Sequence, residues 1–271
     1  MAAKPIANIR AHLLGLVTDL QAALAHHHAG RLDEAEASYR KMLEAAPGHP
    51  QALRLLGVLE TQRGHPERGV ELIDKAFPAL ARFPQAHLDL GNALVRAGKL
   101  ERAVESYREA IALKPDSSTA HVNLAGVLNK LGRFEAAITH CQAALAVQPE
   151  FLAARIVLAV ALKAADRLPE SAEAWREVIA QQPDRAESYY HLASELAELG
   201  LYTEALHCHD RALALEPENV TFHCARGNVL LHLYHADKAE AADRRAISIS
   251  STSQSAMGRT GLGLAPAWAL Q

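Results

Sequence analysis

Residues 84–117, PQAHLDLGNALVRAGKLERAVESYREAIALKPDS, decide the fold of this chain. The apolar residues Leu90 and Leu94 lie one helical turn apart, and the stretch lacks the alternation that a strand requires. Gly98 predicts a turn, because glycine adopts the left-handed conformation that ends a helix. Pro115 predicts the end of a second helix, because proline cannot continue one. The stretch therefore reads as a hairpin of two amphipathic helices.

The packing inside this hairpin is predicted by one small residue and one aromatic residue. Gly91 in the first helix has no side chain, so the two helices can approach each other closely there. Tyr107 in the second helix supplies a large apolar ring that fills the space between them. Glu101 lies in the first turn of the second helix, where the helix dipole favours a carboxylate. These features agree with one another and support the hairpin.

Copies of the hairpin recur every 34 residues, with units that start at 16, 50, 84, 118, 152, 186 and 220. The eighth residue of each unit is small, and these residues are Ala23, Gly57, Gly91, Ala125, Ala159, Ala193 and Gly227. We therefore predict a repeat array over residues 16–250, preceded by an N-terminal capping helix over 1–15. Residues 251–271 are rich in serine and glycine and lose the periodicity, which predicts a disordered or loosely attached tail.

Composition agrees with an all-α protein and narrows the choice of partner. Hydrophobic residues make up 49% of the chain, charged residues 22% and aromatic residues only 5%. The formal net charge of −3 gives no electrostatic argument for a nucleic acid or an anionic membrane as partner. No run approaches the roughly 20 apolar residues of a membrane span. The three cysteines show no CxxC spacing, which fits a reduced, cytoplasmic setting.

The order Leu90-Gly91, Ala103, Tyr107 and Pro115 resembles the tetratricopeptide repeat, and the resemblance extends over most of the chain. It implies a right-handed α-solenoid of about seven helical hairpins, with first helices that line a concave groove. Residues 29–64 and 120–138 also resemble the repeats in front of bacterial O-GlcNAc-transferase-like or sulfotransferase domains. Proteins of the family usually hold a peptide or a partner protein in the groove.

The resemblance predicts a non-catalytic scaffold that binds a peptide or partner protein, with self-association through the terminal repeats as a further possibility. The alternative is the substrate-recruiting region of a protein glycosyltransferase or sulfotransferase whose catalytic domain is absent from this chain. The groove positions of the third to sixth units are Leu88, Asp89, Asn92, Arg96, Val122, Asn123, Lys130, Ile156, Val160, Lys163, Tyr190, His191 and Ser194. Asparagine offers a donor and an acceptor to a peptide backbone, and the basic residues attract acidic groups.

Two more specific binding modes are disfavoured. Some members of the family bind a carboxylate with a clamp of two asparagines and several basic residues. Asn92 and Asn123 fit the asparagine positions, but the positions that should be basic are occupied by Leu88, Ala153 and Val157. A zinc site is suggested by a group of histidines and cysteines near the end of the array, namely His207, Cys208, His209, His223 and Cys224. Their spacing matches no zinc finger, and His209 takes the aromatic packing place. We therefore predict no metal.

The sequence contains none of the motifs that would indicate an enzyme. HExxH, GxSxG and the phosphate-binding GxxxxGK[ST] are all missing, and no nucleophile lies in a recognisable arrangement with a base. We therefore predict that the chain is not an enzyme and needs no cofactor. The sequence leaves the identity of the partner open.

Overall fold

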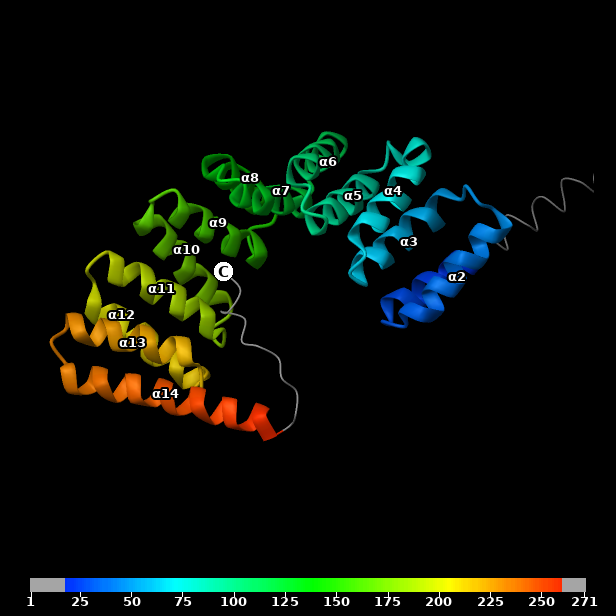
Figure 1. Ribbon diagram of the computed structural model, residues 1–271. Helices are drawn as coiled ribbons and strands as arrows, with labels where there is room; N and C mark the ends of the chain where they lie inside the picture. Colours follow the sequence, from blue (N-terminus) through cyan, green and yellow to red (C-terminus); the bar gives the residue numbers. More distant parts are fainter. Residues whose placement is uncertain (1–17, 260–271) are drawn as a thin grey trace, which may run out of the picture. The chain divides into compact units, whose positions relative to one another are not determined.

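The computed structural model describes residues 18–259, with side chains described as far as residue 250, and every regular element in that range is an α-helix. A helix over 18–28 precedes α2, and pairs of helices follow to the end of α14 (Figure 1). The elements are α2 Leu32–Ala45, α3 Pro50–Gln62, α4 Pro66–Leu80, α5 Pro84–Arg96, α6 Leu100–Leu113, α7 Ser118–Lys130, α8 Phe134–Val147, α9 Leu152–Ala164, α10 Leu168–Gln181, α11 Ala186–Glu198, α12 Tyr202–Leu215, α13 Val220–His232 and α14 Ala236–Arg259. The prediction of an all-α solenoid of helical hairpins is confirmed.

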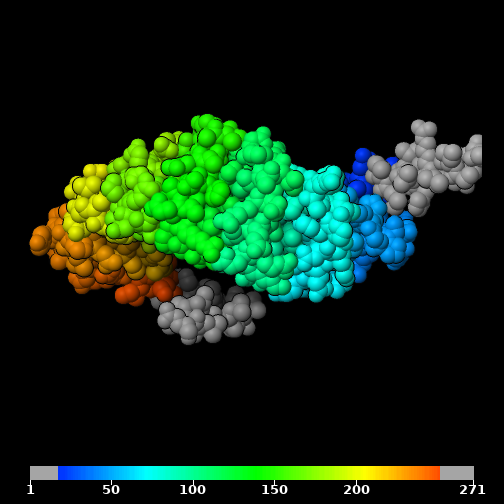
Figure 2. Space-filling view, turned by 90° about the horizontal axis from the view of Figure 1, so that it is seen from above, coloured from blue at the N-terminus to red at the C-terminus, as the bar shows by residue number. Residues whose placement is uncertain are grey.

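The chain divides into two compact units, residues 1–151 and residues 152–271. Unit 1 contains the helices up to α8, and unit 2 contains α9 to α14. Within each unit a hairpin packs against the hairpins that precede and follow it in the sequence. Figure 2 shows the same order on the surface of unit 1, where the colours change from blue to green in bands that follow the chain.

The predicted close approach at Gly91 is confirmed in the hairpin of α5 and α6. A Cβ atom at Gly91 would lie 2.7 Å from Tyr107 Cδ1 and 2.8 Å from Cζ, so the aromatic ring occupies the space that a side chain would need. Tyr107 itself is 2% exposed. The ring of one helix is thus held directly against the backbone of the other.

The hairpin of α3 and α4 replaces this arrangement with two facing glycines. A Cβ on Gly57 or Gly69 would lie 2.7 Å from the carbonyl oxygen of the other residue, so the two backbones nearly touch. Less room remains between these helices, and the fully buried Ile73 takes the place that Tyr107 has in the next hairpin. The glycine at position 69 and the smaller side chain at position 73 therefore compensate for each other.

The turns inside the hairpins use the left-handed conformation that the sequence predicts at Gly98, whose φ is +71°. Two hairpins in unit 2 place other residues in the same conformation, with φ of +60° at Asp166 and +61° at Tyr234. A side chain is strained there, and more so for tyrosine than for aspartate. Tyr234 is also 95% exposed, so packing does not offset its strain.

Successive hairpins are joined by a hydrogen bond that recurs at the fourth residue of a repeat. His87 Nε2 donates to the carbonyl oxygen of Ala81 at 2.8 Å, which lies six residues earlier. The same bond joins His121 to Pro115, Tyr189 to Pro183 and His223 to Pro217, at 3.1, 3.1 and 2.9 Å. Each ring thereby satisfies a carbonyl at the end of the preceding hairpin.

The predicted ends of the array lie partly outside the described residues. The proposed capping helix over 1–15 falls outside them, as do residues 260–271 of the predicted tail. The remainder of that tail overlaps α14, which continues to Arg259. Among the described residues, no helix combines the length and the apolar character needed to cross a lipid bilayer.

Candidate functional site

The first helices of unit 1 carry a pocket of about 430 Å³ at the residues where the sequence predicts a groove. Leu88 and Asn92 reach it from α5, and Asn123 reaches it from α7. Lys114, which follows the last turn of α6, completes its rim together with Ser117 and Thr119. The lining contains amide, hydroxyl and ammonium groups and no carboxylate.

A chain of hydrogen bonds fixes the two asparagines in this pocket. The Tyr107 hydroxyl donates to Asn92 Oδ1 at 2.7 Å, and Asn123 Nδ2 donates to the same oxygen at 3.2 Å. A carbonyl oxygen has two lone pairs, so these two donors satisfy Asn92 Oδ1. Asn92 therefore presents its NH₂ group, and Asn123 presents its oxygen together with its second N–H. The core tyrosine orients both amides.

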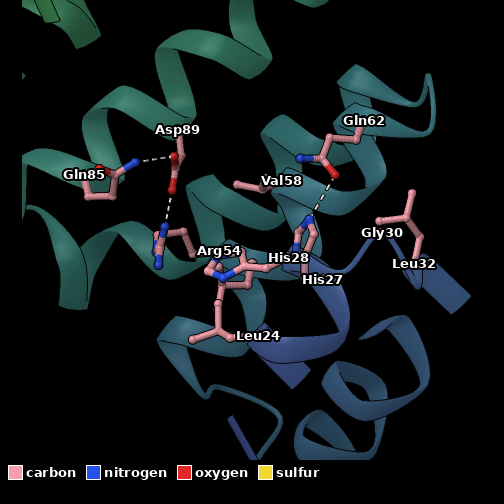
Figure 3. A pocket seen from close by; sticks show the side chains of 11 residues that line it. Leu24, His27, His28, Gly30, Leu32, Arg54, Val58, Gln62, Gln85 and Asp89 are labelled. Carbon is pink, nitrogen blue, oxygen red and sulfur yellow. Dashed lines mark hydrogen bonds and ion pairs between the residues drawn. The ribbon is translucent and has the colours of Figure 1, made fainter. Parts of the chain in front are cut away.

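Unit 1 has a second and larger pocket, of about 660 Å³ (Figure 3), which shares Gln85 with the first. It is lined by Leu24, His27, His28, Gly30, Leu32, Arg54, Leu55, Val58, Gln62, Gln85 and Asp89. His27 donates through Nε2 to Gln62 Oε1 at 2.9 Å, and its Nδ1 lies 3.2 Å from the Tyr39 hydroxyl. These two contacts hold the His27 imidazole in one orientation at the pocket wall.

An ion pair forms part of the wall of the larger pocket. Arg54 on α3 pairs with Asp89 on α5, and Gln85 Nε2 donates to the other oxygen of Asp89 at 2.8 Å (Figure 3). Burial raises the pKa of Asp89, and the positive charge of Arg54 and the hydrogen bonds from Gln85 and Arg54 oppose that effect. Gln85 lines both pockets, so they form one continuous surface on the first helices of unit 1. We call this surface, together with the exposed groove positions at the last turns of α5 and α7, the unit 1 face.

Most of the larger pocket is missing from the sequence prediction, which includes only Asp89 among its lining residues. Its other polar residues lie at groove places of the first two repeats, as His28 does in the first and Arg54 and Gln62 do in the second. The rule that selected the groove positions therefore also applies to the first two repeats. The pairing of Arg54 with Asp89 joins residues of neighbouring repeats and has no signature in either repeat alone.

The remaining predicted residues of unit 1 differ in how much surface they offer. Val122 is only 7% exposed, and it packs into the core rather than lining either pocket. Arg96 and Lys130, at the last turns of α5 and α7, are exposed. Helical spacing places Arg96 on the side of Asn92, and Lys130 on the side of Asn123.

Unit 2 brings its predicted residues into a more aromatic environment. The ring of Tyr190 stacks on that of Phe222, with centroids 5.2 Å apart, and the ring of His191 stacks on that of Trp175 at 4.8 Å. Lys163 Nζ lies 2.7 Å from Glu198 Oε1, so its charge is paired.

Ile156 and Ser194 are partly buried in unit 2, and Val160 is 46% exposed. The predicted groove residues thus fall into a polar group in unit 1 and a more apolar group in unit 2.

A buried polar network in unit 2 has no counterpart in the sequence prediction. Glu195 is 1% exposed, and its Oε1 lies 2.9 Å from both Trp175 Nε1 and the Ser171 hydroxyl. Ser171 Oγ also lies 2.7 Å from the carbonyl oxygen of Ala159. Burial raises the pKa of Glu195, and the hydrogen bonds from Ser171 and Trp175 oppose that shift. The network joins three consecutive helices of unit 2, α9, α10 and α11, through buried polar groups.

The histidines near the end of the array have structural contacts. His209 is 1% exposed, as its aromatic packing place predicts, and burial lowers its pKa to about 4. His223 donates to the carbonyl oxygen of Pro217. Among the described residues, no three His, Cys, Asp or Glu side chains come together in a way that could hold a metal ion.

Family models of the tetratricopeptide repeat match this chain at residues 26–90, 88–151, 128–196 and 190–254. The matched segments overlap and run together from residue 26 to residue 254. The chain belongs to the tetratricopeptide repeat family. Its hairpins are therefore tetratricopeptide repeats, and their first helices form the faces described above. A comparison with curated protein sequences gave no match.

Solved structures of tetratricopeptide repeat proteins have the same fold. A protein from Parabacteroides merdae is 17% identical, with a TM-score of 0.65 over 86% of this chain and 93% of its own. MamA is also 17% identical, with a TM-score of 0.61 over 68% of this chain and 98% of its own. YrrB, which is described as having an unusual peptide-binding site, is 19% identical, with a TM-score of 0.58 over 71% of this chain and 100% of its own.

Proposed function

We propose that this protein is an interaction scaffold that holds an extended peptide segment of a partner protein on the unit 1 face. The observation that carries the proposal is the hydrogen-bond chain from Tyr107 through Asn92 to Asn123. It leaves Asn123 with one acceptor and one donor side by side, which match the N–H and C=O groups of a peptide backbone. Membership of the tetratricopeptide repeat family and the peptide-binding site described for YrrB support the proposal.

The arrangement favours backbone recognition over recognition of one side chain. Amide contacts of this kind contribute about 1 kcal/mol each, so the asparagines alone give modest affinity. The two pockets beside them, of about 430 and 660 Å³, provide room for side chains that project from the bound segment. Affinity would come from the backbone contacts, and the choice of partner from the pockets.

The test is affinity capture followed by cross-linking mass spectrometry, with the wild-type protein, Asn123→Ala and Gln142→Ala. Asn123 is preferable to Asn92, because loss of Asn92 would leave the buried Tyr107 hydroxyl without its acceptor. Gln142 is an exposed amide on α8, a second helix, and provides the matched control. We expect Asn123→Ala alone to reduce capture, and cross-links to form at Lys114 and Lys130.

Two results would count against this function. Capture that is unchanged by Asn123→Ala would remove the role of the asparagines. Cross-links confined to lysines of second helices, such as Lys41 on α2 and Lys75 on α4, would place the partner on the opposite side of the hairpins. The transferase alternative predicts a glycosyltransferase or sulfotransferase domain among the captured partners.

A further inference from the structure

The unit 1 face carries more positive than negative charge. Its groove positions hold one carboxylate, Asp89, and that carboxylate is paired with Arg54. Arg96 and Lys130 remain exposed, and Lys114 stands at the rim of the smaller pocket. Within residues 18–250, none of these three cations has an ion pair or a hydrogen bond. The face therefore has three positive charges that the protein itself leaves uncompensated.

This excess does not follow from the composition of the chain. The sequence has 31 Asp and Glu residues against 28 Lys and Arg residues, a formal net charge of −3. Several arginines elsewhere have carboxylate partners within hydrogen-bond distance, as Arg133 has in Glu101 at 2.8 Å and Arg167 has in Glu170 at 2.6 Å. Acidic residues are thus abundant, and yet none compensates the three cations on this face.

The three cations lie close to the asparagines that would hold a peptide backbone. Lys114 lines the same pocket as Asn92 and Asn123. Arg96 follows Asn92 by four residues and Lys130 follows Asn123 by seven, which places them about 6 and 10 Å further along their helices. A segment held by the asparagines can therefore reach all three cations with its own side chains.

Unit 2 gives a contrast within the same protein. The one lysine among its predicted groove residues, Lys163, is paired with Glu198. The neighbouring groove residues include the partly exposed Val160 and the stacked ring of Tyr190. The uncompensated positive charge therefore belongs to the unit 1 face and is not a general property of the first helices.

We propose that the ligand of the unit 1 face is an acidic, extended segment of a partner protein, with carboxylates placed at Lys114 and at Arg96 and Lys130. The inference rests on the proposed function and adds the chemical class of the ligand. Carboxylates complement ammonium and guanidinium groups through charge-assisted hydrogen bonds. The basic places of the carboxylate clamp are not involved, since Leu88 occupies one of them and lines the pocket.

The test is a selection of short random peptides displayed on phage, carried out on the wild-type protein and on a Lys114→Gln/Lys130→Gln variant. We expect the wild-type selection to enrich peptides rich in Asp and Glu, and the double variant to lose that enrichment. Lys75→Gln, which removes an exposed charge from α4, is the control and should retain it. Enrichment of neutral or basic peptides by the wild-type protein would overturn the inference while leaving the proposed function intact.

The enriched peptide is then titrated by fluorescence anisotropy. Exposed ion pairs are weak and screened by salt, so each Lys→Gln change should weaken binding about two- to five-fold, and raising the salt from about 50 to 200 mM should weaken it further. Equal affinity at both salt concentrations would contradict the acidic ligand. A single-stranded DNA oligonucleotide that displaces the peptide at lower concentration would assign the face to nucleic acid. Failure to enrich any peptide would overturn both proposals.

Discussion

Replacement of Gly91 by alanine measures how tightly the α5–α6 hairpin is packed. The new Cβ would lie 2.7 Å from Tyr107 Cδ1 and 2.8 Å from Cζ, in a ring that is 2% exposed and bonded through its hydroxyl to Asn92. Overpacking of this kind costs about 1–3 kcal/mol, and loss of the hydroxyl bond adds about 1 kcal/mol. The better helix propensity of alanine offsets about 0.5–1 kcal/mol of this destabilisation. We expect a net destabilisation of about 2 kcal/mol.

Gly126 provides a matched control, because it lies inside α7 and, apart from the backbone around it in its own helix, no atom lies within 4 Å of the position that its Cβ would occupy. At Gly126 the substitution changes helix propensity without overpacking, so Gly126→Ala should stabilise the protein by about 0.5–1 kcal/mol. Urea unfolding followed by circular dichroism gives both changes in the free energy of unfolding. Hydrogen exchange should show that Gly91→Ala lowers the protection of backbone amides mainly in residues 84–117. Equal effects of the two substitutions, or a Gly91→Ala variant as stable as the wild type, would refute the packing argument.

Three further predictions concern single residues. Tyr234→Gly should stabilise the protein by about 1 kcal/mol in thermal unfolding, because it relieves a φ of +61° at a side chain that is 95% exposed; an unchanged melting temperature would contradict this. His209 has a folded-state pKa of about 4 against about 6.5 when unfolded, so stability should fall by as much as about 3 kcal/mol as the pH drops from 6.5 towards 4. His209→Phe should flatten this pH profile, whereas His207→Gln, on the exposed side of α12, should leave it unchanged. Glu195→Gln keeps a side-chain oxygen that can accept from Trp175 and Ser171, so it should cost less than Glu195→Ala, which leaves the buried Trp175 N–H without its acceptor and should lose about 1–3 kcal/mol; equal losses in the two variants would contradict this.

Local spacing explains why the hairpins can be predicted from the sequence. The interval from Gly91 to Tyr107 and the turn at Gly98 lie inside one repeat, so one 34-residue segment contains the information that positions them. The burial of His209 follows from the same rule, because its place in the repeat is an aromatic one.

The candidate site is less predictable because it depends on contacts between repeats. Arg54 and Asp89 belong to different repeats and are 35 residues apart, and each is an ordinary polar residue when taken alone. The pairing of Lys163 with Glu198 also crosses a repeat boundary, and it removes a cation that the sequence offers to a ligand. Whether a charge on the first helices is free or compensated can be read only from the structure.

The hydrogen bonds between successive hairpins affect how the number of repeats can change during evolution. The donor ring of His87 or His121 and its acceptor carbonyl are only six residues apart, so both belong to the same short segment at a repeat boundary. A gene duplication of one 34-residue block would therefore copy the donor and its acceptor together. The inserted repeat would arrive with its own connection to the preceding one, and no compensating substitution elsewhere in the chain would be required. Lengthening or shortening by whole repeats is thus open to this protein, whereas an insertion within the six residues between the ring and its carbonyl would break the bond.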